Sequence, residues 1–466
     1  MYIKQIYTSS ISQASYFIES QGVAAVIDPI RDTEVYLKLA KERNATIQYV
    51  LETHFHADFV SGHLELAEKT GAVIIFGPTA KPAFKAMVAK DGNTVNLGKI
   101  KIKLIHTPGH TLESSCFLAY NEEDHPYVVF TGDTLFVGDV GRPDLGSGNL
   151  GKEALASMLY DSLNKLISGL PDSVIIYPGH GAGSACGKSL GKETWSTVGV
   201  QKNKNYALQP MNRELFIKKV IEDLPAPPPY FSHDVNANKN GYEMLETVIQ
   251  KAIMPLNLED FRAEMNKGAV VLDVRNSTEF GIGFIKGSLN IGLDGAFAVW
   301  VGNLIPADKP IVLVVNEQKE RDAVIRLARI GFDNVKGYQK DNLMGWIKAQ
   351  YTLDHVETIS EHQLELYLDE GYIPLDVRTA AEASENRIKH SLNIPLEVLP
   401  QQLAQLNSAS KYLIYCAGGY RSMIAASILK GKGFTNVANV RGGIAQVKKE
   451  MPSLVETIES KSRIIK

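Results

Sequence analysis

A pattern of 20 residues occurs twice in the sequence, and the two copies begin 103 residues apart. The first copy, LDVRNSTEFGIGFIKGSLNI, begins at Leu272, and the second, LDVRTAAEASENRIKHSLNI, begins at Leu375. An apolar run, a loop, a helical segment and then GFDNV or GFTNV follow each copy. A period this long indicates duplicated domains, because solenoid repeats are only ~20–50 residues long. The second half of the chain therefore predicts two similar α/β units of about 100 residues each.

The second of these units carries a cysteine in a loop that suits a thiolate. The loop, YCAGGYRS, lies between an apolar strand and a helical segment and contains Cys416 and Arg421. Inward-pointing backbone amides and the positive end of the following helix both stabilise a thiolate. Arg421 is placed to hold an anionic sulfur group. In the first unit Asn316 aligns with Cys416, and the loop NEQKERD has no glycines, so we expect that unit to be unable to accept sulfur.

Short apolar runs in the first 180 residues end in polar or glycine-rich turns. Strands are predicted for YIKQIY, AAVIDP, YVLETH, AVIIFG, IKLIHT, SSCFLAY, YVVFTGD and VIIYPGH, and helices for EVYLKLAKERN and GHLELAEKTG. Several strands run directly into ETHFH, HTPGH, TGDT or YPGH. Polar groups gathered at strand ends predict a site built on loops over a rigid sheet.

Six histidines and aspartates occupy these turns. They are His54, His56, Asp58, His110, Asp133 and His180. One histidine at a strand end is usually no more than a hydrogen-bonded polar residue. Imidazole and carboxylate groups are, however, the ligands that iron and zinc take in proteins. Six of them in neighbouring turns predict a metal site.

The composition excludes several classes of protein. The chain is 44% hydrophobic and 22% charged with a net charge of −3, so a nucleic-acid partner is not expected. No stretch approaches the ~20 apolar residues of a membrane span, and the first 20 residues lack the pattern of a signal peptide. Three widely spaced cysteines are no disulfide framework and are typical of a reducing compartment. We therefore expect a cytoplasmic protein that does not contact a membrane.

A proline-rich segment divides the two halves of the chain. LPAPPPYFSH begins at Leu224 and has four prolines in five residues, which cannot continue a helix. With the repeats, this segment predicts a first domain over residues 1–250, a second over 251–352 and a third over 353–466.

The first domain resembles the metallo-β-lactamase superfamily, and in particular its persulfide dioxygenases. HxHxD at 54–58, TPGHT, TGDT and PGHG match the superfamily in order and spacing. TPGHTLESSCF at 107–117 and Arg142, nine residues after Asp133, match the persulfide dioxygenases. The resemblance implies an αββα sandwich with one Fe(II) held by His54, His110 and Asp133, for which zinc is a potential substitute. Two histidines and one carboxylate leave iron positions open for sulfur and dioxygen.

Phe59 departs from the pattern of the two-metal members, which have a histidine directly after the HxHxD aspartate. It weakens a second metal site, although the glutathione-using persulfide dioxygenases keep a histidine there. His56, Asp58 and His180 are then expected either to orient the iron ligands or to be ordinary packed polar residues.

Three further residues lie in or near these motifs. The resemblance implies that Arg142 grips the carboxylate of a thiol carrier, the alternative being a surface arginine. Cys186 lies in the loop GAGSACGKSLG, where a role in handling persulfide and a plain loop thiol both remain open. Cys116 is expected in the core.

The two repeats resemble rhodanese domains over their whole length. The resemblance makes Cys416 the sulfur acceptor of an active third domain and the second domain catalytically inactive. The order of domains resembles that of persulfide dioxygenase–rhodanese fusions over essentially the whole chain.

The resemblance implies a bifunctional enzyme of sulfide detoxification. It would oxidise the persulfide of a small thiol (glutathione, coenzyme A or bacillithiol) with O₂ to sulfite, and would form or consume thiosulfate at Cys416. The alternatives are a glyoxalase II-like zinc thioesterase, that is a hydroxyacylglutathione hydrolase, fused to a sulfurtransferase, and a non-catalytic persulfide sensor. The sequence leaves the carrier, the metal in the cell, the direction of sulfur transfer and any homo-oligomer open.

Overall fold

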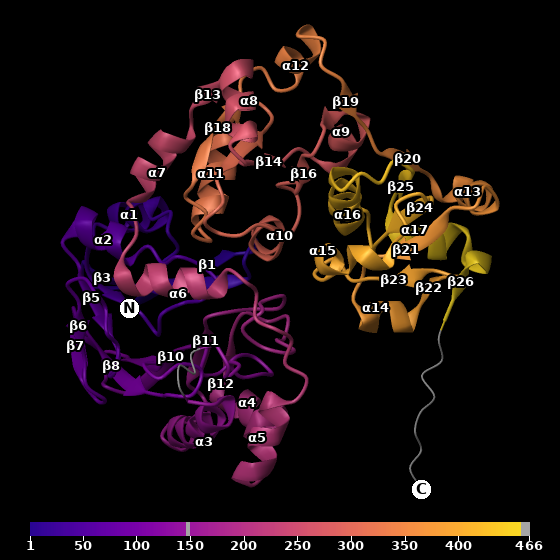
Figure 1. Cartoon of the computed structure of the whole chain (residues 1–466). Helices are drawn as coiled ribbons and strands as arrows, with labels where there is room; N and C mark the ends of the chain where they lie inside the picture. Colours follow the sequence, from indigo (N-terminus) through magenta and orange to yellow (C-terminus); the bar gives the residue numbers. More distant parts are fainter. Residues whose placement is uncertain (146–149, 458–466) are drawn as a thin grey trace, which may run out of the picture. The chain divides into compact units, whose positions relative to one another are not determined.

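The computed structural model describes residues 1–145 and 150–457 (Figure 1). The described chain forms two compact units. The first contains residues 1–248 together with 325–332, and the second contains 249–324 and the chain from Asp333 onward. No helix among the described residues is long and apolar enough to cross a membrane.

The first unit is built on two six-stranded sheets. In the first sheet, of order β1-β2-β3-β4-β5-β6, the pairs from β3 to β6 are parallel and the others antiparallel. Its strands are β1 (Tyr2–Thr8), β2 (Gln13–Ser20), β3 (Val23–Ile27), β4 (Thr46–Leu51), β5 (Val73–Phe76) and β6 (Met87–Val88). The second sheet has the order β12-β11-β10-β9-β8-β7, and only β10 and β11 pair in parallel. Its strands are β7 (Thr94–Leu97), β8 (Ile100–His106), β9 (Ser115–Tyr120), β10 (Pro126–Gly132), β11 (Ile175–Pro178) and β12 (Ser196–Thr197).

The two sheets pack face to face, and helices cover their outer faces. The core between the sheets contains Tyr16 and Ile27 from one sheet and Leu104 and Phe130 from the other. Helices α1 (Glu34–Glu42) and α2 (His63–Thr70) pack on the first sheet. Helices α3 (Lys152–Ser168) and α5 (Arg213–Ile221) share a second core with β9 and β11. These four layers confirm the αββα sandwich expected from the sequence.

Helices α6 and α7 complete the first unit. Helix α4 (Val198–Lys204) lies earlier, directly after β12. Helix α6 (Phe231–Asn240) follows the proline-rich segment, and α7 (Leu245–Ala252) leads into the second unit. Residues 325–332, from the end of α11 (Glu320–Ala328), also belong to this unit, where Arg329 binds both carboxylate oxygens of Asp32 at 2.7 Å.

The second unit contains two parallel five-stranded sheets with the same topology, which confirms the duplication. Their orders are β13-β18-β17-β14-β16 and β20-β25-β24-β21-β23. The first comprises β13 (Pro255–Leu256), β14 (Val270–Asp273), β16 (Leu289–Asn290), β17 (Ile311–Val314) and β18 (Val335–Gln339). The second comprises β20 (Glu357–Ile359), β21 (Ile373–Asp376), β23 (Leu392–Asn393), β24 (Tyr412–Tyr415) and β25 (Val437–Val440).

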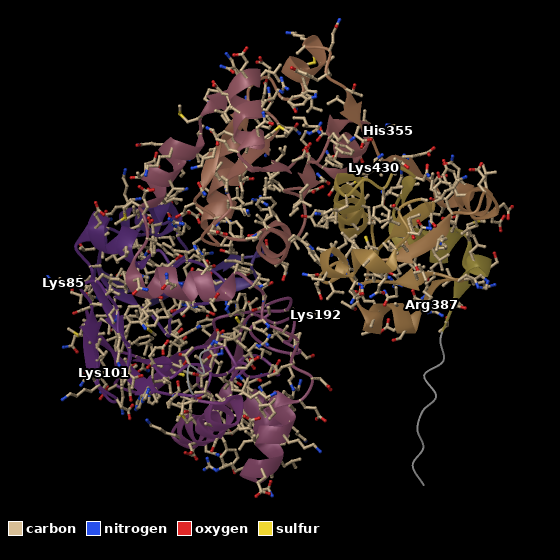
Figure 2. All side chains as sticks on the ribbon, in the orientation of Figure 1. Lys85, Lys101, Lys192, His355, Arg387 and Lys430 are labelled. Atoms are coloured by element: carbon tan, nitrogen blue, oxygen red, sulfur yellow. The ribbon has the colours of Figure 1, made fainter. Side chains whose placement is uncertain are left out.

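Helices and two small antiparallel pairs surround these sheets. The helices of the second unit are α8 (Leu258–Asn266), α9 (Ser277–Ile282), α10 (Phe297–Leu304), α12 (Met344–Lys348), α13 (Leu364–Asp369), α14 (Ala380–Glu385), α15 (Leu399–Gln402), α16 (Tyr420–Gly431) and α17 (Gly443–Glu450). The small pairs are β15 (Phe284–Ile285) with β19 (Leu353–Asp354), and β22 (Arg387–Ile388) with β26 (Val455–Glu456). Arg387, labelled in Figure 2, pairs with Glu456 across the latter. A half-exposed pair of this kind contributes only about 1 kcal/mol.

Candidate functional site

The predicted metal residues follow four strands of the first unit. His54 comes after β4 of one sheet, while His110, Asp133 and His180 come after β8, β10 and β11 of the other. Strands β8, β10 and β11 run in the same direction, so their carboxyl ends meet at one edge of the sheet. The sandwich therefore brings residues that are 126 positions apart in sequence to one place.

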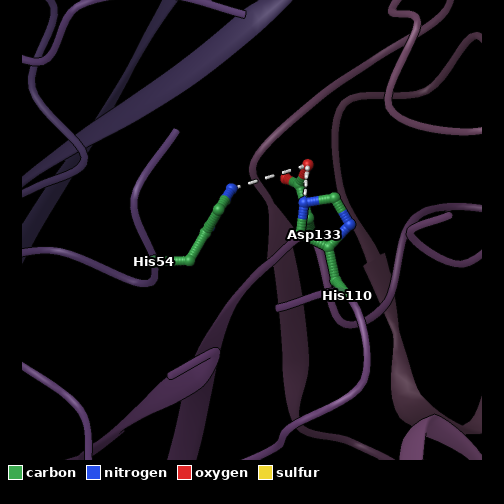
Figure 3. Close-up of side chains that lie close together, drawn as sticks. All are labelled: His54, His110 and Asp133. Carbon is green, nitrogen blue, oxygen red and sulfur yellow. Dashed lines mark ion pairs between the residues drawn. The ribbon is translucent and has the colours of Figure 1, made fainter. Parts of the chain in front are cut away.

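His54, His110 and Asp133 form the first cluster. Nε2 of His54 lies 3.9 Å and Nε2 of His110 lies 3.5 Å from the same oxygen of Asp133, Oδ2. Figure 3 shows the two rings approaching that carboxylate from different directions. All three side chains are buried, and their ligand atoms lie within 4.8 Å of one another.

Hydrogen bonds fix the tautomer of both histidines in this cluster. Nδ1 of His110 lies 2.9 Å from the carbonyl oxygen of Arg142, which can only accept, so Nδ1 carries the proton. The Thr53 hydroxyl donates to Asp28 at 2.8 Å, so it accepts from Nδ1 of His54 at 2.9 Å. In each ring Nε2 is therefore the nitrogen that is free to bind a metal beside Asp133. Outer partners of this kind are typical of histidines that bind metals.

The electrostatics of the cluster suit a cation. Burial, and then the neighbouring His56, His110 and His180, lower the pKa of His54 well below its usual range, so its imidazole is neutral. Neither oxygen of Asp133 has a hydrogen-bond partner among the described residues. Lone pairs and a carboxylate that face one another in a buried space repel unless a positive ion lies between them. Two imidazoles and one carboxylate fit a divalent metal.

His56, the other histidine of the HxH motif, has a ring nitrogen within 4.8 Å of the ligand atoms of Asp58 and His180, and its Nδ1 is buried without a hydrogen-bond partner among the described residues. Its Nε2 lies 3.1 Å from Oδ1 of Asp28 and 3.5 Å from Glu52. Burial alone would lower the pKa of His56, but the carboxylate of Asp28 raises it to about 9. Phe59 packs on the His56 ring with centroids 4.3 Å apart. His56 thus contacts Asp28 and Glu52 through one ring nitrogen, next to the metal cluster.

Asp58 and His180 form a second cluster on the other side of Asp133. Nε2 of His180 lies 3.4 Å from Oδ2 of Asp58 and 3.5 Å from Oδ1 of Asp133. The buried thiol of Cys186 joins it, since its sulfur and the ligand atoms of Asp133 and His180 lie within 4.8 Å of one another. Burial, Asp58 and Asp133 raise the pKa of this thiol well above its usual range. Cys186 therefore lies beside Asp133 and His180.

Arg142 contacts the centre through its backbone oxygen and not through its guanidinium. Two nitrogens of its guanidinium donate to the two carboxylate oxygens of Asp144, each at 2.7 Å. The guanidinium also donates to the carbonyl oxygens of Ala185 and Pro225. The side chain is buried and its guanidinium is already paired with Asp144, so the guanidinium is not available to a thiol carrier. Its backbone oxygen holds His110. The structure therefore places Arg142 as a support of the metal ligands.

The Cys416 loop lies in the second unit, between β24 and α16. The sulfur accepts the N–H of Gly419 at 3.1 Å, and the thiol lies 3.6 Å from the Ser422 hydroxyl. Gly419 has φ of 104°, a left-handed conformation that glycine adopts without strain. The amide, the buried sulfur and the start of a twelve-residue helix form the cradle predicted from the sequence.

Arg421 binds a carboxylate in this structure. Its two terminal nitrogens donate to the two oxygens of Glu382 at 2.8 and 2.7 Å. This pairing lowers the pKa of Glu382 to about 2. Glu382 also forms a capping box with Thr379 at the start of α14, which fixes its position. Arg421 can therefore bind an anionic sulfur group only if it gives up one or both of its hydrogen bonds to Glu382.

The middle repeat has no thiol at the corresponding place. Asp273 pairs with Val314 and Asp376 pairs with Tyr415, so by strand register Val315 corresponds to Cys416. The loop to α11 is one residue longer, and Asn316 corresponds to Cys416 only when the helices are aligned. At the strand, the alignment made from sequence is thus shifted by one residue. Neither Val315 nor Asn316 carries a thiol, so we still expect this repeat to be unable to accept sulfur.

The comparisons with known proteins agree with this architecture. A family model described as the metallo-beta-lactamase superfamily matches residues 11–180, and one described as the rhodanese-like domain matches 257–346 and 360–450. The solved structure of a metallo-beta-lactamase from Staphylococcus aureus is 35% identical with a TM-score of 0.65, covering 73% of this chain and 98% of that one. The chain belongs to the metallo-β-lactamase superfamily.

Two further relatives are similar to its metallo-β-lactamase domain. The structure of ETHE1 from Myxococcus xanthus is 30% identical with a TM-score of 0.45, covering 51% of this chain and 98% of that one. A probable hydroxyacylglutathione hydrolase from Schizosaccharomyces pombe is 36% identical over 165 residues, which are 35% of this chain and 60% of the relative. The chain thus spans about three fifths of the length of the curated relatives that it matches.

Two residues of the metallo-β-lactamase domain that shape the centre had no signal in the sequence. Asn238 on α6 donates to the backbone oxygens of His56 and Phe59, which fixes the HxHxD loop from 180 residues away. At Gly141 a Cβ atom would lie 2.0 Å from the backbone oxygen of Asp133 and 3.0 Å from Nδ1 of His110. In the sequence, only the turn VGRP indicates the position of Gly141.

A cavity opens beside the metal cluster within the metallo-β-lactamase domain. Its volume is about 450 Å³. It is lined by Phe55, Ala57, Thr79, Lys81, His110, Thr111, Leu112, Glu113, Leu145, Val235 and Lys239. A pocket of this size and mixed lining is typical of a small-molecule site.

Replacing Gly443 by alanine is expected to disrupt the Cys416 loop. An alanine Cβ would lie 2.2 Å from the Cys416 backbone oxygen, and the φ of 56° is itself unfavourable for a side chain. We expect the free energy of unfolding to fall by more than about 1–2 kcal/mol, with loss of sulfur transfer. Urea unfolding and a thiosulfate-to-cyanide assay measure both. Gly431→Ala is the matched control, because a Cβ there meets open space; equal effects of the two variants would contradict the steric argument.

Proposed function

We propose that the metallo-β-lactamase domain is a persulfide dioxygenase and that the third domain is a sulfurtransferase. The balanced reaction of the first site is R–S–SH + O₂ + H₂O → R–SH + SO₃²⁻ + 2 H⁺. The terminal sulfur loses four electrons and dioxygen gains them, so no further oxidant is needed. The substrate is the persulfide of a low-molecular-weight thiol.

The donor set of the first cluster carries this proposal. His54, His110 and Asp133 gather around a single position, and residue 59 is phenylalanine in place of the histidine of the two-metal members. This is the ligand set of mononuclear non-haem iron oxygenases. Fe(II) bound there would supply open positions for the persulfide sulfur and for dioxygen.

The surrounding residues prepare that position. Thr53 and the Arg142 carbonyl orient the two imidazoles, and Asn238 fixes the loop that carries His54. Burial of Phe59 beside His56 keeps water from that side of the loop. A preorganised, dry site strengthens every charge interaction inside it.

The cavity favours a small anionic carrier. Lys81 and Lys239 are exposed at its lining and offer two positive charges, and Glu113 offers one negative charge. Glutathione and bacillithiol each carry two carboxylates and one amine, which complements this set. Coenzyme A, a larger carrier with phosphate groups, would extend beyond a cavity of about 450 Å³.

At the third domain, sulfite and sulfane sulfur combine on Cys416. The step Cys–S–S⁻ + SO₃²⁻ → Cys–S⁻ + S–SO₃²⁻ breaks the S–S bond of the cysteine persulfide and forms that of thiosulfate. The reverse step would instead charge Cys416 from thiosulfate. The amide of Gly419 is placed to stabilise the thiolate in either direction.

A second candidate function is hydrolysis of an acylated thiol by a zinc-loaded centre. The similarity to a protein named a probable hydroxyacylglutathione hydrolase favours it. A metal-bound hydroxide would then be the nucleophile. Phe59, which stands where the two-metal members have a histidine, argues for the dioxygenase.

The deciding experiment measures O₂ uptake and sulfite after anaerobic loading with Fe(II) or with zinc. Persulfides of glutathione, bacillithiol and coenzyme A are added, and a thioester of glutathione is offered to both forms. We expect uptake and sulfite with iron alone, and faster turnover with the first two carriers. Thioester hydrolysis without uptake would establish the hydrolase. Neither reaction despite bound metal would indicate a persulfide-sensing module.

A further inference from the structure

A cavity of about 460 Å³ lies in the second unit, between the middle repeat and the Cys416 loop. On one side it is lined by Ile282 and neighbouring residues of α9, which belongs to the repeat that has no thiol. On the other side it is lined by Gly418 and Gly419 of that loop and by Arg441, directly after β25. Both repeats therefore build this cavity.

Close packing holds α9 against the third domain. The Gly281 carbonyl accepts the N–H of Val356 at 3.1 Å, and a Cβ atom at Gly281 would lie only 3.3 Å from the Met423 side chain of α16. Figure 1 shows α9 close to α16 and β20, and it contacts both. In the loop after β24, the Tyr420 hydroxyl donates to the carbonyl oxygen of Gly292 in the middle repeat at 2.7 Å. The wall formed by α9 is thus fixed relative to the reactive loop.

One polar atom at the cavity lacks a partner. Asn439, on β25, lines the cavity and is only 3% exposed. Its Oδ1 is buried without a hydrogen-bond partner among the described residues. A buried acceptor destabilises a fold unless a donor reaches it. A ligand with an N–H or O–H group would satisfy this oxygen.

The other lining groups suit an organic anion. Arg441 is exposed and is the one charged side chain among the described residues that line the cavity, so an anionic group is favoured. Ile282 is 80% exposed, more than any other large apolar side chain in the described part of the chain. Cavities of this size bind small organic molecules, whereas sulfite or cyanide would fill only a small part of the space.

The cavity adjoins the sulfur of Cys416. Gly419, which lines the cavity, donates its N–H to that sulfur at 3.1 Å. At Gly418 an added Cβ atom would meet no other atom within 4 Å, so the space over the loop is open there. In a persulfide, the outer sulfur would extend about 2 Å beyond Sγ. A ligand in the cavity can therefore bring a sulfur atom of its own to the Cys416 loop.

We propose that the middle repeat forms one wall of the site at which Cys416 exchanges sulfur with an organic thiol, and that Ile282 and Arg441 select an anionic carrier there. This inference rests on the sulfurtransferase proposed for the third domain. A carboxylate of glutathione or bacillithiol would pair with Arg441, and an amide N–H of the carrier would donate to Asn439. The repeat that cannot accept sulfur thus determines which carrier the active repeat uses.

The exchange needs no further reactant. The step is Cys–S–S⁻ + R–SH → Cys–S⁻ + R–S–SH. The S–S bond of the cysteine persulfide breaks, that of the carrier persulfide forms, and the thiol proton moves to the new terminal sulfur. The sulfane sulfur changes partner, and no net oxidation or reduction occurs.

The test compares a large and a small sulfur acceptor, with thiosulfate as the donor. The metal-loaded protein is assayed without O₂, so that the first site cannot consume the carrier persulfide, and sulfite release is measured with glutathione or with cyanide. Ile282→Glu adds a negative charge to the wall, and Arg441→Gln removes the positive one. We expect each variant to lower the ratio of kcat/KM for glutathione to kcat/KM for cyanide about 10-fold, through a higher KM for glutathione. This is the loss typical of one hydrogen bond to a charged group.

Two exposed or half-exposed positions of the second unit provide matched controls away from the cavity. Ile347→Glu adds the same charge at an exposed isoleucine of α12, and Arg387→Gln removes the same charge on β22. Both should keep the native ratio. No transfer to glutathione, a native ratio in Ile282→Glu and Arg441→Gln, or an equal fall in the controls would overturn the inference while the sulfurtransferase stands. No transfer to cyanide by the native protein would overturn the sulfurtransferase, and this inference with it.

Discussion

Asp133→Asn is expected to abolish metal binding at the cluster of His54, His110 and Asp133 while leaving the metal-free protein folded. The carboxylate faces His54 and His110 with one oxygen and His180 with the other. Asparagine keeps the shape but removes the charge, and its NH₂ group would occupy one of these faces. We expect the affinity of the first cluster for Fe(II) to fall by more than about 100-fold, and O₂ uptake with it.

The stability of this variant provides a second readout. Both oxygens of Asp133 lack hydrogen-bond partners in the described structure, so the metal-free native protein buries an unsatisfied carboxyl group. An asparagine NH₂ can donate to a lone pair of the facing histidines, so unfolding of the metal-free variant should need as much urea as the native protein or more. Asp161→Asn, at an exposed carboxylate paired with Arg213, should change neither metal content nor stability by more than about 1 kcal/mol. Full metal content in Asp133→Asn would contradict the central place given to this carboxylate.

Local sequence patterns were sufficient to predict the edge of the sandwich that carries the site. Each strand that delivers a ligand is a short β-branched or apolar run, and each ends directly before its polar turn. Because the carboxyl ends of β8, β10 and β11 share one edge, the motifs had to converge there. The duplicated sheets followed from the repeat in the same way.

The orientation of individual side chains could not be predicted, because it depends on partners far away in the sequence. Nε2 of His56 contacts Asp28, directly after β3, and Arg421 pairs with Glu382 on α14. The motifs alone do not predict these partners. Strand β2 was missed for a related reason. Its sequence, QASYFIES, is half polar, yet every residue is buried, since Gln13 and Ser15 find buried partners.

Cys186 illustrates the same limit most clearly. Its sequence context is a glycine- and serine-rich loop, which on its own predicts only a turn. Its place beside Asp133 and His180 comes from two anchors, Arg142 and Asp139, that a single sequence does not connect to it. Burial and geometry, and not motif, therefore place this thiol beside Asp133 and His180.

Cys416→Ser is expected to reduce sulfur transfer from thiosulfate to cyanide to the uncatalysed level. Serine keeps the volume and can still accept the N–H of Gly419, but an alkoxide is not accessible at neutral pH and cannot carry sulfane sulfur. Mass spectrometry after incubation with thiosulfate should show one added sulfur atom on the third domain of the native protein and none on the variant.

Sulfite production from added persulfide should stay within about twofold of the native rate in this variant, because the metal ligands and the Cys416 loop lie in separate units. Thiosulfate should then no longer form and sulfite should accumulate. Cys116→Ser is the control for loss of a thiol, and it should transfer sulfur normally. If Cys416→Ser lost both activities while its metal content was unchanged, oxidation would require a persulfide delivered from Cys416. The two sites would then catalyse successive steps of one reaction, and the division into two independent activities would be wrong.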